Sequence, residues 1–421
     1  MLETPHPRER WIIAAAATVM QLALGAVYAW SVFRKPLADA LEASVTEVNV
    51  AFTVANVTLG IAAFVGGLWL TRVGPRVLAL TAGCLYGLGV FLAGFSAHHL
   101  GLLYVTYGAL AGTGIGLGYI VPLATLVKWF PDKRGMITGL AVAGFGGGAL
   151  VVSPIARALV GAYGPFTAFH MLGAAFLVVV LAAALFMRDP PAGYVPAGWR
   201  PPVATTHAST PDYTLGEALR TWQWYALWVV LFLSVGAGIS IIAEAVPMAQ
   251  ELVSASDAQA TALVGTIALF NGAGRLVWAS LSDALGRRTV FVMMFLLQAG
   301  VFCVLPLAGS YQQLLALACV SLLCYGGGFG TMPALVADYF GPRHVGRIYG
   351  LLLTAWSAGA ILGPLIVSRL RDASGTYTSG LRVIAALMVV GAVVPLLLQS
   401  PARSAARART APVRARRAAR A

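Results

Sequence analysis

Charged residues are scarce in this chain, and acidic residues are the scarcest of them. Of 421 residues, 10% are Asp, Glu, Lys or Arg and 59% are hydrophobic, with a mean hydropathy of +0.82. A soluble domain carries about 25% charged residues, so this composition excludes an ordinary soluble protein. The apolar runs extend for about 20 residues or more, which favours membrane-spanning helices over the short alternating strands of a barrel. We expect an all-α polytopic membrane protein.

Residues that bind metals or perform catalysis are also few. The four cysteines lie in apolar runs without a metal-type spacing and are expected to be small core residues. The glycine-rich stretches 108–118, 144–148 and 326–330 have no preceding strand and no GxxxxGK[ST] pattern, so they favour close helix packing over nucleotide binding. No Ser/His/Asp, metal-type or paired-carboxylate cluster occurs in the apolar runs. We therefore expect no enzyme, no cofactor and no metal.

Twelve apolar segments are divided equally by one polar stretch. That stretch, 188–220, contains six prolines and is predicted to be a cytoplasmic linker. It separates an N-terminal six-helix half (1–187) from a C-terminal six-helix half (221–399), which a basic cytoplasmic tail (400–421) follows. The twelve predicted transmembrane helices are 11–33, 48–70, 77–97, 101–127, 136–158, 165–187, 222–244, 260–281, 289–309, 312–337, 347–368 and 380–399.

The basic residues lie mostly on one side of these segments. If the N-terminus is cytoplasmic, 21 Lys and Arg residues face the cytoplasm and 6 lie on the outside. Basic residues concentrate on the cytoplasmic side of membrane proteins, which predicts that both termini are cytoplasmic and that the protein is integral to the plasma (inner) membrane. The net charge of +13 then belongs to loops and a tail that can contact anionic lipid, and nucleic acid is not expected as a partner.

One basic residue, Arg275, remains inside an apolar segment. It precedes Asp283 by eight residues, which places it roughly 12 Å deeper at about 1.5 Å per residue. An arginine in the bilayer costs about 2.5–3.5 kcal/mol and normally faces a water-filled cavity and an anion. Among the acidic residues only Glu244 falls within the predicted segments, at the end of one, and Asp338 directly follows another. The counter-ion is therefore expected to be a substrate. The alternative is a structural arginine that binds a neighbouring carboxylate or helix-end carbonyls.

The two halves contain related sequences, with one residue added in the second loop. Two related six-helix halves are typical of transporters whose binding site lies between them at the middle of the membrane. The first copy reads Gly116-Leu117-Gly118-Tyr119, Lys128-Trp129-Phe130, Arg134, Gly139-Leu140 and Phe145, and the second reads Gly326-Gly327-Gly328-Phe329, Asp338-Tyr339-Phe340, Arg343, Gly350-Leu351 and Trp356.

Two loops resemble the GxxxDRxGRR signature of the major facilitator superfamily. The loop after the second segment runs from Gly67 to Arg76 and has Thr71 at the aspartate position. The loop after the eighth segment keeps the DxxGRR end and has Ala279 at the leading glycine. The resemblance covers residues 11–399 and implies the two-half fold of that superfamily. It also implies that these loops form cytoplasmic gates, with Arg72, Arg76, Asp283, Arg287 and Arg288 as the gate residues.

A narrower resemblance is found in the first segment, where Gly25-Ala26-Val27-Tyr28-Ala29-Trp30-Ser31-Val32-Phe33 precedes Pro36-Leu37. This stretch looks like the oxalate–formate antiporter family and the related monocarboxylate transporters. Those families place a substrate-binding arginine in the eighth segment, which matches Arg275, and tyrosines of the first and fourth segments at the site. The sequence departs from both: Trp356 occupies what we take to be the position of the oxalate exchangers' lysine, and Asn271 replaces an aspartate of the animal monocarboxylate type.

Counting from segment ends places several polar and aromatic side chains near the level of Arg275. Guanidinium binds a carboxylate through two parallel hydrogen bonds, and tyrosine and asparagine add neutral donors. Each aromatic residue could instead be an ordinary packing residue. The predicted substrate-binding residues are Arg275, Tyr119, Asn271, Tyr28, Tyr325 and Trp356.

The predicted function is secondary active transport of a small monocarboxylate, lactate-like or formate-like, by alternating access. One alternative is dicarboxylate exchange of the oxalate–formate type. Another is a non-transporting membrane sensor, for which the sequence offers no output domain. Transport could be coupled to a proton or to a counter-substrate anion. Glu244 and His170 are the candidate proton carriers, and the alternative for both is a simple position at the membrane interface.

Overall fold

Twelve membrane crossings are built from ten long apolar helices. The computed structural model describes residues 7–97, 99–196, 199, 212–399 and 401. Among them, ten helices are long and apolar enough to cross a membrane. Two of these, α3 (Val45–Ala93) and α6 (Arg134–Ala184), are about twice the usual length. Each contains a kink and forms two crossings, so the prediction of twelve transmembrane segments is confirmed.

The kinks in α3 and α6 have the same local cause. Gly74 has a φ of 79° and Gly164 a φ of 80°, a region that glycine adopts without strain. Each glycine is followed by a proline, Pro75 or Pro165, which cannot donate to the preceding turn but suits the first turn of the next helix. A Gly-Pro pair therefore ends one crossing and begins the next.

The remaining crossings follow the predicted segments, with some helices interrupted. The first crossing consists of α1 (Pro7–Leu24), η1 (Gly25–Ala29) and α2 (Trp30–Ala40), and the fourth of α4 (Leu100–Leu103), η2 (Tyr104–Ala111) and α5 (Gly112–Trp129). The C-terminal half comprises α8 (Trp222–Val253), α9 (Asp257–Leu285), α10 (Arg287–Val304), η3 (Leu305–Leu307), α11 (Tyr311–Phe340), α12 (Val345–Leu352), α13 (Thr354–Ser374) and α14 (Thr378–Leu397).

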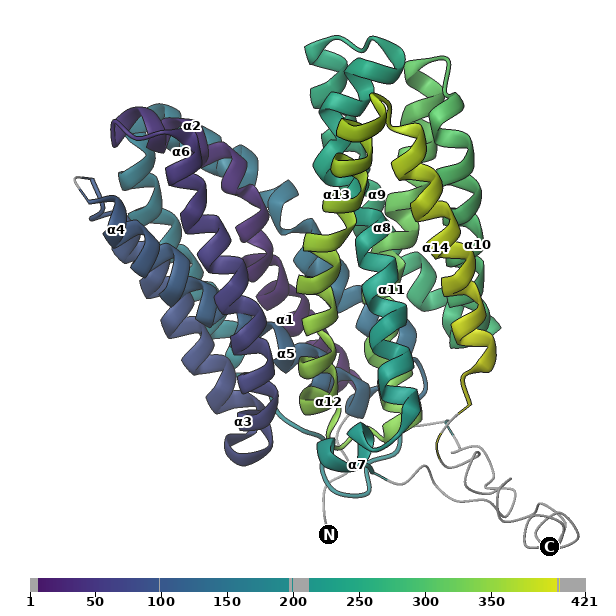
Figure 1. The fold of residues 1–421 in the computed structure, drawn as a ribbon. Coiled ribbons are helices and arrows are strands. Elements are labelled where there is room, and N and C mark those ends of the chain that lie inside the picture. The colour runs from purple at the N-terminus through teal and green to yellow at the C-terminus, as the bar shows by residue number, and fades with distance from the viewer. Residues whose placement is uncertain (1–6, 98, 197–198, 200–211, 400, 402–421) are drawn as a thin grey trace, which may run out of the picture.

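The two halves stand side by side and diverge toward one end (Figure 1). At the other end, α6 of the first half contacts α9 and α11, and α3 contacts α12. The short helix α7 (Leu215–Leu219), the start of α1 and the end of α14 all lie at this end, which we call the linker end. The opposite end is called the open end.

The described linker residues from Asp212 to Arg220 are attached to the second half, whereas Arg188 and Asp189 bind Trp129 and Lys128 of the first half. Thr214 and Glu217 form a capping box at the start of α7, and Tyr213 N donates to the carbonyl oxygen of Phe340 at 2.8 Å. Asp212 Oδ1 accepts from the backbone N of Arg343 at 3.1 Å. Residues 197–198 and 200–211 of the predicted linker, and residues 400 and 402–421 of the predicted tail, lie outside the described residues.

Candidate functional site

A cavity of about 410 Å³, its open mouth included, lies between the two halves. Both halves contribute to its walls, five residues from the first and four from the second. Among the lining residues, Arg275 alone is charged. The lining residues are Tyr28, Leu59, Gly60, Tyr119, Phe145, Arg275, Phe329, Leu353 and Trp356.

Arg275 projects from α9 and reaches across to the first half. Its side chain is almost fully buried, at 2% exposure. Nη1 donates to the carbonyl oxygen of Val142 on α6 at 3.0 Å, and Nε donates to Asn271 Oδ1 at 3.4 Å. The guanidinium carbon lies 5.5 Å from the centre of the Phe329 ring. Within the described residues no carboxylate forms an ion pair with Arg275, so its charge is offset only by neutral dipoles and an aromatic ring.

Glycines of α6 permit this close approach. A Cβ at Gly146 would lie 3.1 Å from Arg275 Nε, and a Cβ at Gly139 would lie 2.6 Å from the carbonyl oxygen of Arg275. Side chains at these positions would push α6 and α9 apart and move the guanidinium. The glycine-rich stretch of α6 therefore positions the arginine beside the opposite half.

Aromatic rings form the wall on the side of the first half. The ring of Phe145 meets Tyr28 edge-on at 5.4 Å and Tyr119 edge-on at 5.0 Å between centres. Tyr119 is buried, at 5% exposure, whereas Tyr28 faces the open space, at 38%. Tyr28 lies in η1, a short interruption of the α-helix that begins at Gly25. A Cβ at Gly25 would overlap the carbonyl of Phe145, so glycine there lets η1 approach α6 closely. The structure thus brings both predicted tyrosines to the cavity.

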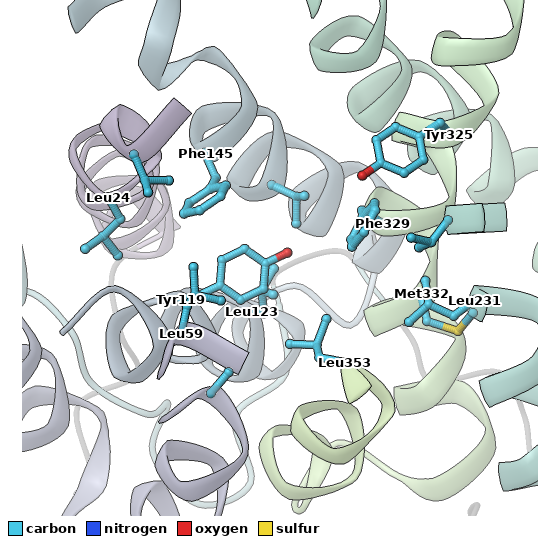
Figure 2. Packing of buried hydrophobic residues seen from close by; sticks show 14 of the residues in the cluster. Leu24, Leu59, Tyr119, Leu123, Phe145, Leu231, Tyr325, Phe329, Met332 and Leu353 are labelled. Atoms are coloured by element: carbon cyan, nitrogen blue, oxygen red, sulfur yellow. The ribbon is translucent and has the colours of Figure 1, made fainter. Parts of the chain in front are cut away.

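The second half supplies a matching wall. Tyr325 is 3% exposed and packs edge-on against Phe329 at 5.3 Å. Figure 2 shows the hydroxyls of Tyr119 and Tyr325 pointing toward each other from opposite halves, with the rings of Phe145 and Phe329 beside them. Trp356 lines the cavity from α13, just after the helix is interrupted at Leu353. Tyr325 itself stands behind the lining, next to Phe329.

Asn271 contacts Arg275 instead of lining the cavity. It shares the face of Arg275, as predicted, but it does not line the cavity. Its Oδ1 instead accepts from Arg275 Nε. Its amide oxygen therefore restrains the orientation of the guanidinium together with the carbonyl oxygen of Val142.

Five lining residues were missed by the sequence reasoning: Leu59, Gly60, Phe145, Phe329 and Leu353. The internal repeat contained a signal for two of them. Phe145 corresponds to Trp356, and Phe329 corresponds to Tyr119, so two of the predicted aromatic residues have an aromatic counterpart in the other half. Leu59, Gly60 and Leu353 are apolar or small, and residue chemistry alone does not distinguish them from packing residues.

The two candidate proton carriers lie away from the cavity lining. Helix α8 runs to Val253, well past the predicted end at 244, so Glu244 lies within the helix. Its Oε2 accepts from the Tyr377 hydroxyl at 2.8 Å. His170 packs between Phe91 and Phe95, with ring centres 4.8 and 4.5 Å away, inside the first half. Neither contacts Arg275 in the described structure.

Charged residues hold the halves together at the linker end. Asp283, at the end of α9, accepts from the backbone N of Gly135 at 2.9 Å and of Met136 at 2.7 Å at the start of α6. Carboxylates are favourable at a helix N-terminus. Arg287 binds Asp283 at 2.5 Å and Asp338 at 3.2 Å, and Asp338 also binds Arg134 of the first half at 2.8 Å. Asp283 and Arg287 thus lie between the halves, where the predicted gate requires them.

The other predicted gate residues lie elsewhere. Arg72 and Arg76 are exposed, and Arg347 of α12 makes the contact to this loop by donating to Leu68 O and to Thr71 Oγ1. Arg288 donates to the carbonyl oxygens of Pro395 and Leu396 within the second half. With Thr71 in place of an acid, the first loop offers no charge for Arg72 or Arg76 to bind.

His344 borders this contact just before α12, outside the membrane-spanning helices. Burial lowers the pKa of its imidazole below the ordinary value of 6.5, and the neighbouring Arg347 and Arg343 lower it further. The imidazole is therefore neutral at neutral pH and adds no positive charge to this end.

The sequence is similar to those of known transporters. A sequence model described as the Major Facilitator Superfamily matches residues 10–253 and 227–420. The chain belongs to the Major Facilitator Superfamily. It is 31% identical over 365 residues to an uncharacterized MFS-type transporter, YhjX, of Escherichia coli (strain K12), covering 86% of this chain and 88% of that protein. The predicted membership of the superfamily is thereby confirmed.

Other superfamily relatives carry more specific names. The oxalate:formate antiporter of Oxalobacter formigenes is 29% identical over 357 residues, covering 84% of this chain and 83% of the antiporter. Human monocarboxylate transporter 11 is 29% identical over 403 residues, covering 91% and 82%. The superfamily transporter FucP, crystallised in the outward conformation, has the same fold, with a TM-score of 0.70, 15% identity and 91% and 97% of the two chains covered. This protein is therefore a multi-pass superfamily transporter homologous to carboxylate carriers.

Proposed function

We propose that this transporter carries a small monocarboxylate, lactate-like or formate-like in size, by alternating access between its two halves. The observation that supports the proposal is Arg275: a buried cation that borders the cavity, is held by both halves and binds no carboxylate within the described residues. A charge in a dry site is costly unless an opposite charge joins it. A substrate carboxylate supplies that charge and fits the guanidinium fork.

The charge of the lining favours one carboxylate over two. Arg275 is the one charged residue among those that line the cavity, and Trp356 occupies what we take to be the position of the oxalate exchangers' lysine. A monocarboxylate therefore forms a neutral complex, whereas a dicarboxylate brings an unmatched negative charge into low dielectric. Exchange of oxalate for formate is the second candidate, because the oxalate:formate antiporter is 29% identical to this chain.

We also propose that the linker end faces the cytoplasm and that the protein resides in the plasma (inner) membrane. The linker-end loops and the predicted tail together contain 21 of the 28 Lys and Arg residues, and basic residues concentrate on the cytoplasmic side of membrane proteins. In this orientation the cavity opens outward. On the cytoplasmic side, ion pairs among Asp283, Arg287, Asp338 and Arg134 connect the two halves.

The test of transport is flux into liposomes that contain the purified protein. Labelled lactate or formate is expected to accumulate in these liposomes but not in liposomes without protein. It is also expected to exchange with unlabelled carboxylate loaded inside. A thermal-shift screen of mono- and dicarboxylates identifies the best substrate first, because a ligand at a hundred times its Kd stabilises the fold by about 2.7 kcal/mol. Stabilisation by a carboxylate without any flux would favour a sensor and contradict the proposal.

Coupling to protons is tested at Glu244. We expect Glu244→Gln to abolish uptake driven by a pH gradient and to preserve counterflow, because glutamine cannot take up a proton but still accepts the hydrogen bond from Tyr377. Glu251→Gln is the matched control: Glu251 lies on the same helix, and its Oε2 accepts from Arg371 Nη2 at 2.8 Å. Unchanged pH-driven uptake in Glu244→Gln would exclude this residue, and His170 would be the next candidate.

A further inference from the structure

Gly60 of α3 is the one glycine among the residues that line the cavity. Glycines in membrane helices commonly let a neighbouring helix approach, as Gly67 does on the same helix: a Cβ there would lie 2.1 Å from the carbonyl oxygen of Gly346. Gly60 is different, because among the described atoms beyond its own helical turns a Cβ would approach only Ser357 Oγ, at an ordinary contact distance of 3.5 Å. Helix packing therefore does not require a glycine at position 60, and the missing side chain leaves its space to the cavity.

The helix that carries Gly60 is held on two sides and has no room to move away from the cavity. On one side it is in backbone contact with α5, since a Cβ at Gly116 would lie 2.2 Å from the carbonyl oxygen of Leu59. On the other side it contacts α12, since a Cβ at Gly350 would lie 2.9 Å from the carbonyl oxygen of Ala63. Interiors packed this closely respond to the addition of a single methylene group. A side chain added at position 60 would therefore take its volume from the cavity.

The lining next to Gly60 is apolar and comes from both halves. Leu59 precedes Gly60 in the chain, and Trp356 precedes Ser357, the residue that a Cβ at Gly60 would contact. With the carboxylate on Arg275, the rest of the substrate lies against apolar and aromatic side chains, which favour hydrocarbon. Formate has only a hydrogen atom beyond its carboxylate, whereas lactate has a two-carbon group that needs such a recess.

We propose that Gly60 is a specificity-determining residue: the space of its missing side chain receives the organic group of the substrate and sets the largest monocarboxylate that the transporter accepts. This inference rests on the proposed function and deepens it, because it names a substrate of lactate size, larger than formate. One methylene group more or less in an apolar pocket changes selectivity about 10- to 200-fold. Side chains added at position 60 therefore discriminate against lactate, and more strongly the larger they are.

Gly60→Ala and Gly60→Val test this role through the selectivity for lactate over formate. The selectivity is the ratio of kcat/KM for the two labelled substrates, measured for each full-length variant in liposomes, so the amount of folded protein cancels. Gly60→Val is expected to lower this ratio about tenfold or more, and Gly60→Ala to lower it by a smaller factor. The alanine variant keeps the test decisive if the valine variant does not fold, because its Cβ makes only the ordinary contact with Ser357 Oγ.

Gly300→Val is the matched control. Gly300 lies within α10 and is exposed, and no described atom beyond its own helical turns lies within 4 Å of a Cβ at that position. The control adds the same side chain to a membrane helix away from the cavity, so its ratio is expected to equal that of the parent. An unchanged or higher ratio in the folded Gly60 variants, a similar fall in Gly300→Val, or a parent that carries formate but not lactate would overturn this inference and leave the proposed function standing. A parent that carries neither carboxylate would overturn the proposed function itself.

Discussion

Arg275→Lys is expected to abolish carboxylate transport, although the positive charge is kept. Arginine can hold the carbonyl oxygen of Val142 and the amide of Asn271 with some of its N–H groups and present the remaining edge to a carboxylate. The lysine ammonium is a point charge without this fixed fork. Loss of a buried, hydrogen-bonded charge pair costs about 2–5 kcal/mol, which corresponds to a roughly 30-fold or greater loss of affinity.

The measurement is uptake of labelled lactate or formate into liposomes, normalised to folded protein. Arg371→Lys is the matched control: Arg371 binds Glu251 at 2.8 Å near the open end, with its side chain 44% exposed, and does not line the cavity. Exposed ion pairs contribute little, so the control is expected to transport at nearly the parental rate. Near-normal uptake by Arg275→Lys would refute the assignment of Arg275 as the carboxylate-binding residue.

Trp356→Lys is expected to shift the preference of the transporter from monocarboxylates toward oxalate. Trp356 lines the same cavity as Arg275, so a lysine there supplies a second positive charge and removes part of an aromatic wall. In the parent, the second carboxylate of oxalate has no positive charge to bind, and burying it in a dry site costs several kcal/mol of binding free energy. At about 1.4 kcal/mol per tenfold change, this predicts a parental preference for monocarboxylates of a hundredfold or more.

Competition between labelled monocarboxylate and unlabelled oxalate measures this shift in parent and variant. Trp356→Gln is the control, because it removes the same aromatic wall without adding a charge and should weaken monocarboxylates without improving oxalate. The buried lysine carries an insertion cost, so expression is expected to fall and uptake must again be normalised to folded protein. Strong competition by oxalate in the parent would refute the one-charge argument and favour the oxalate–formate exchanger.

The superfamily and the position of the key cation could be predicted from local features of the sequence. Hydrophobic length determines a transmembrane helix, and the twelve predicted segments match the helices of the structure because in lipid each helix satisfies its own backbone. Arg275 could be recognised because a cation inside an apolar transmembrane helix is costly, whichever helices surround it. Tyr28, Tyr119 and Trp356 also line the cavity, since depth along a helix follows from residue count.

Only the tertiary structure decided which side chains meet, because a contact depends on how helices rotate and cross as well as on depth. It turned Asn271 toward Arg275 instead of the cavity, left Arg72 and Arg76 exposed, and placed Arg134 and Asp338 in the contact between the halves. It also brought Phe145 and Phe329 to the site. Close approaches between glycines and backbone set these positions, and such approaches join residues far apart in the chain. Hydropathy and spacing describe one helix at a time, whereas the binding site belongs to the surface between two halves.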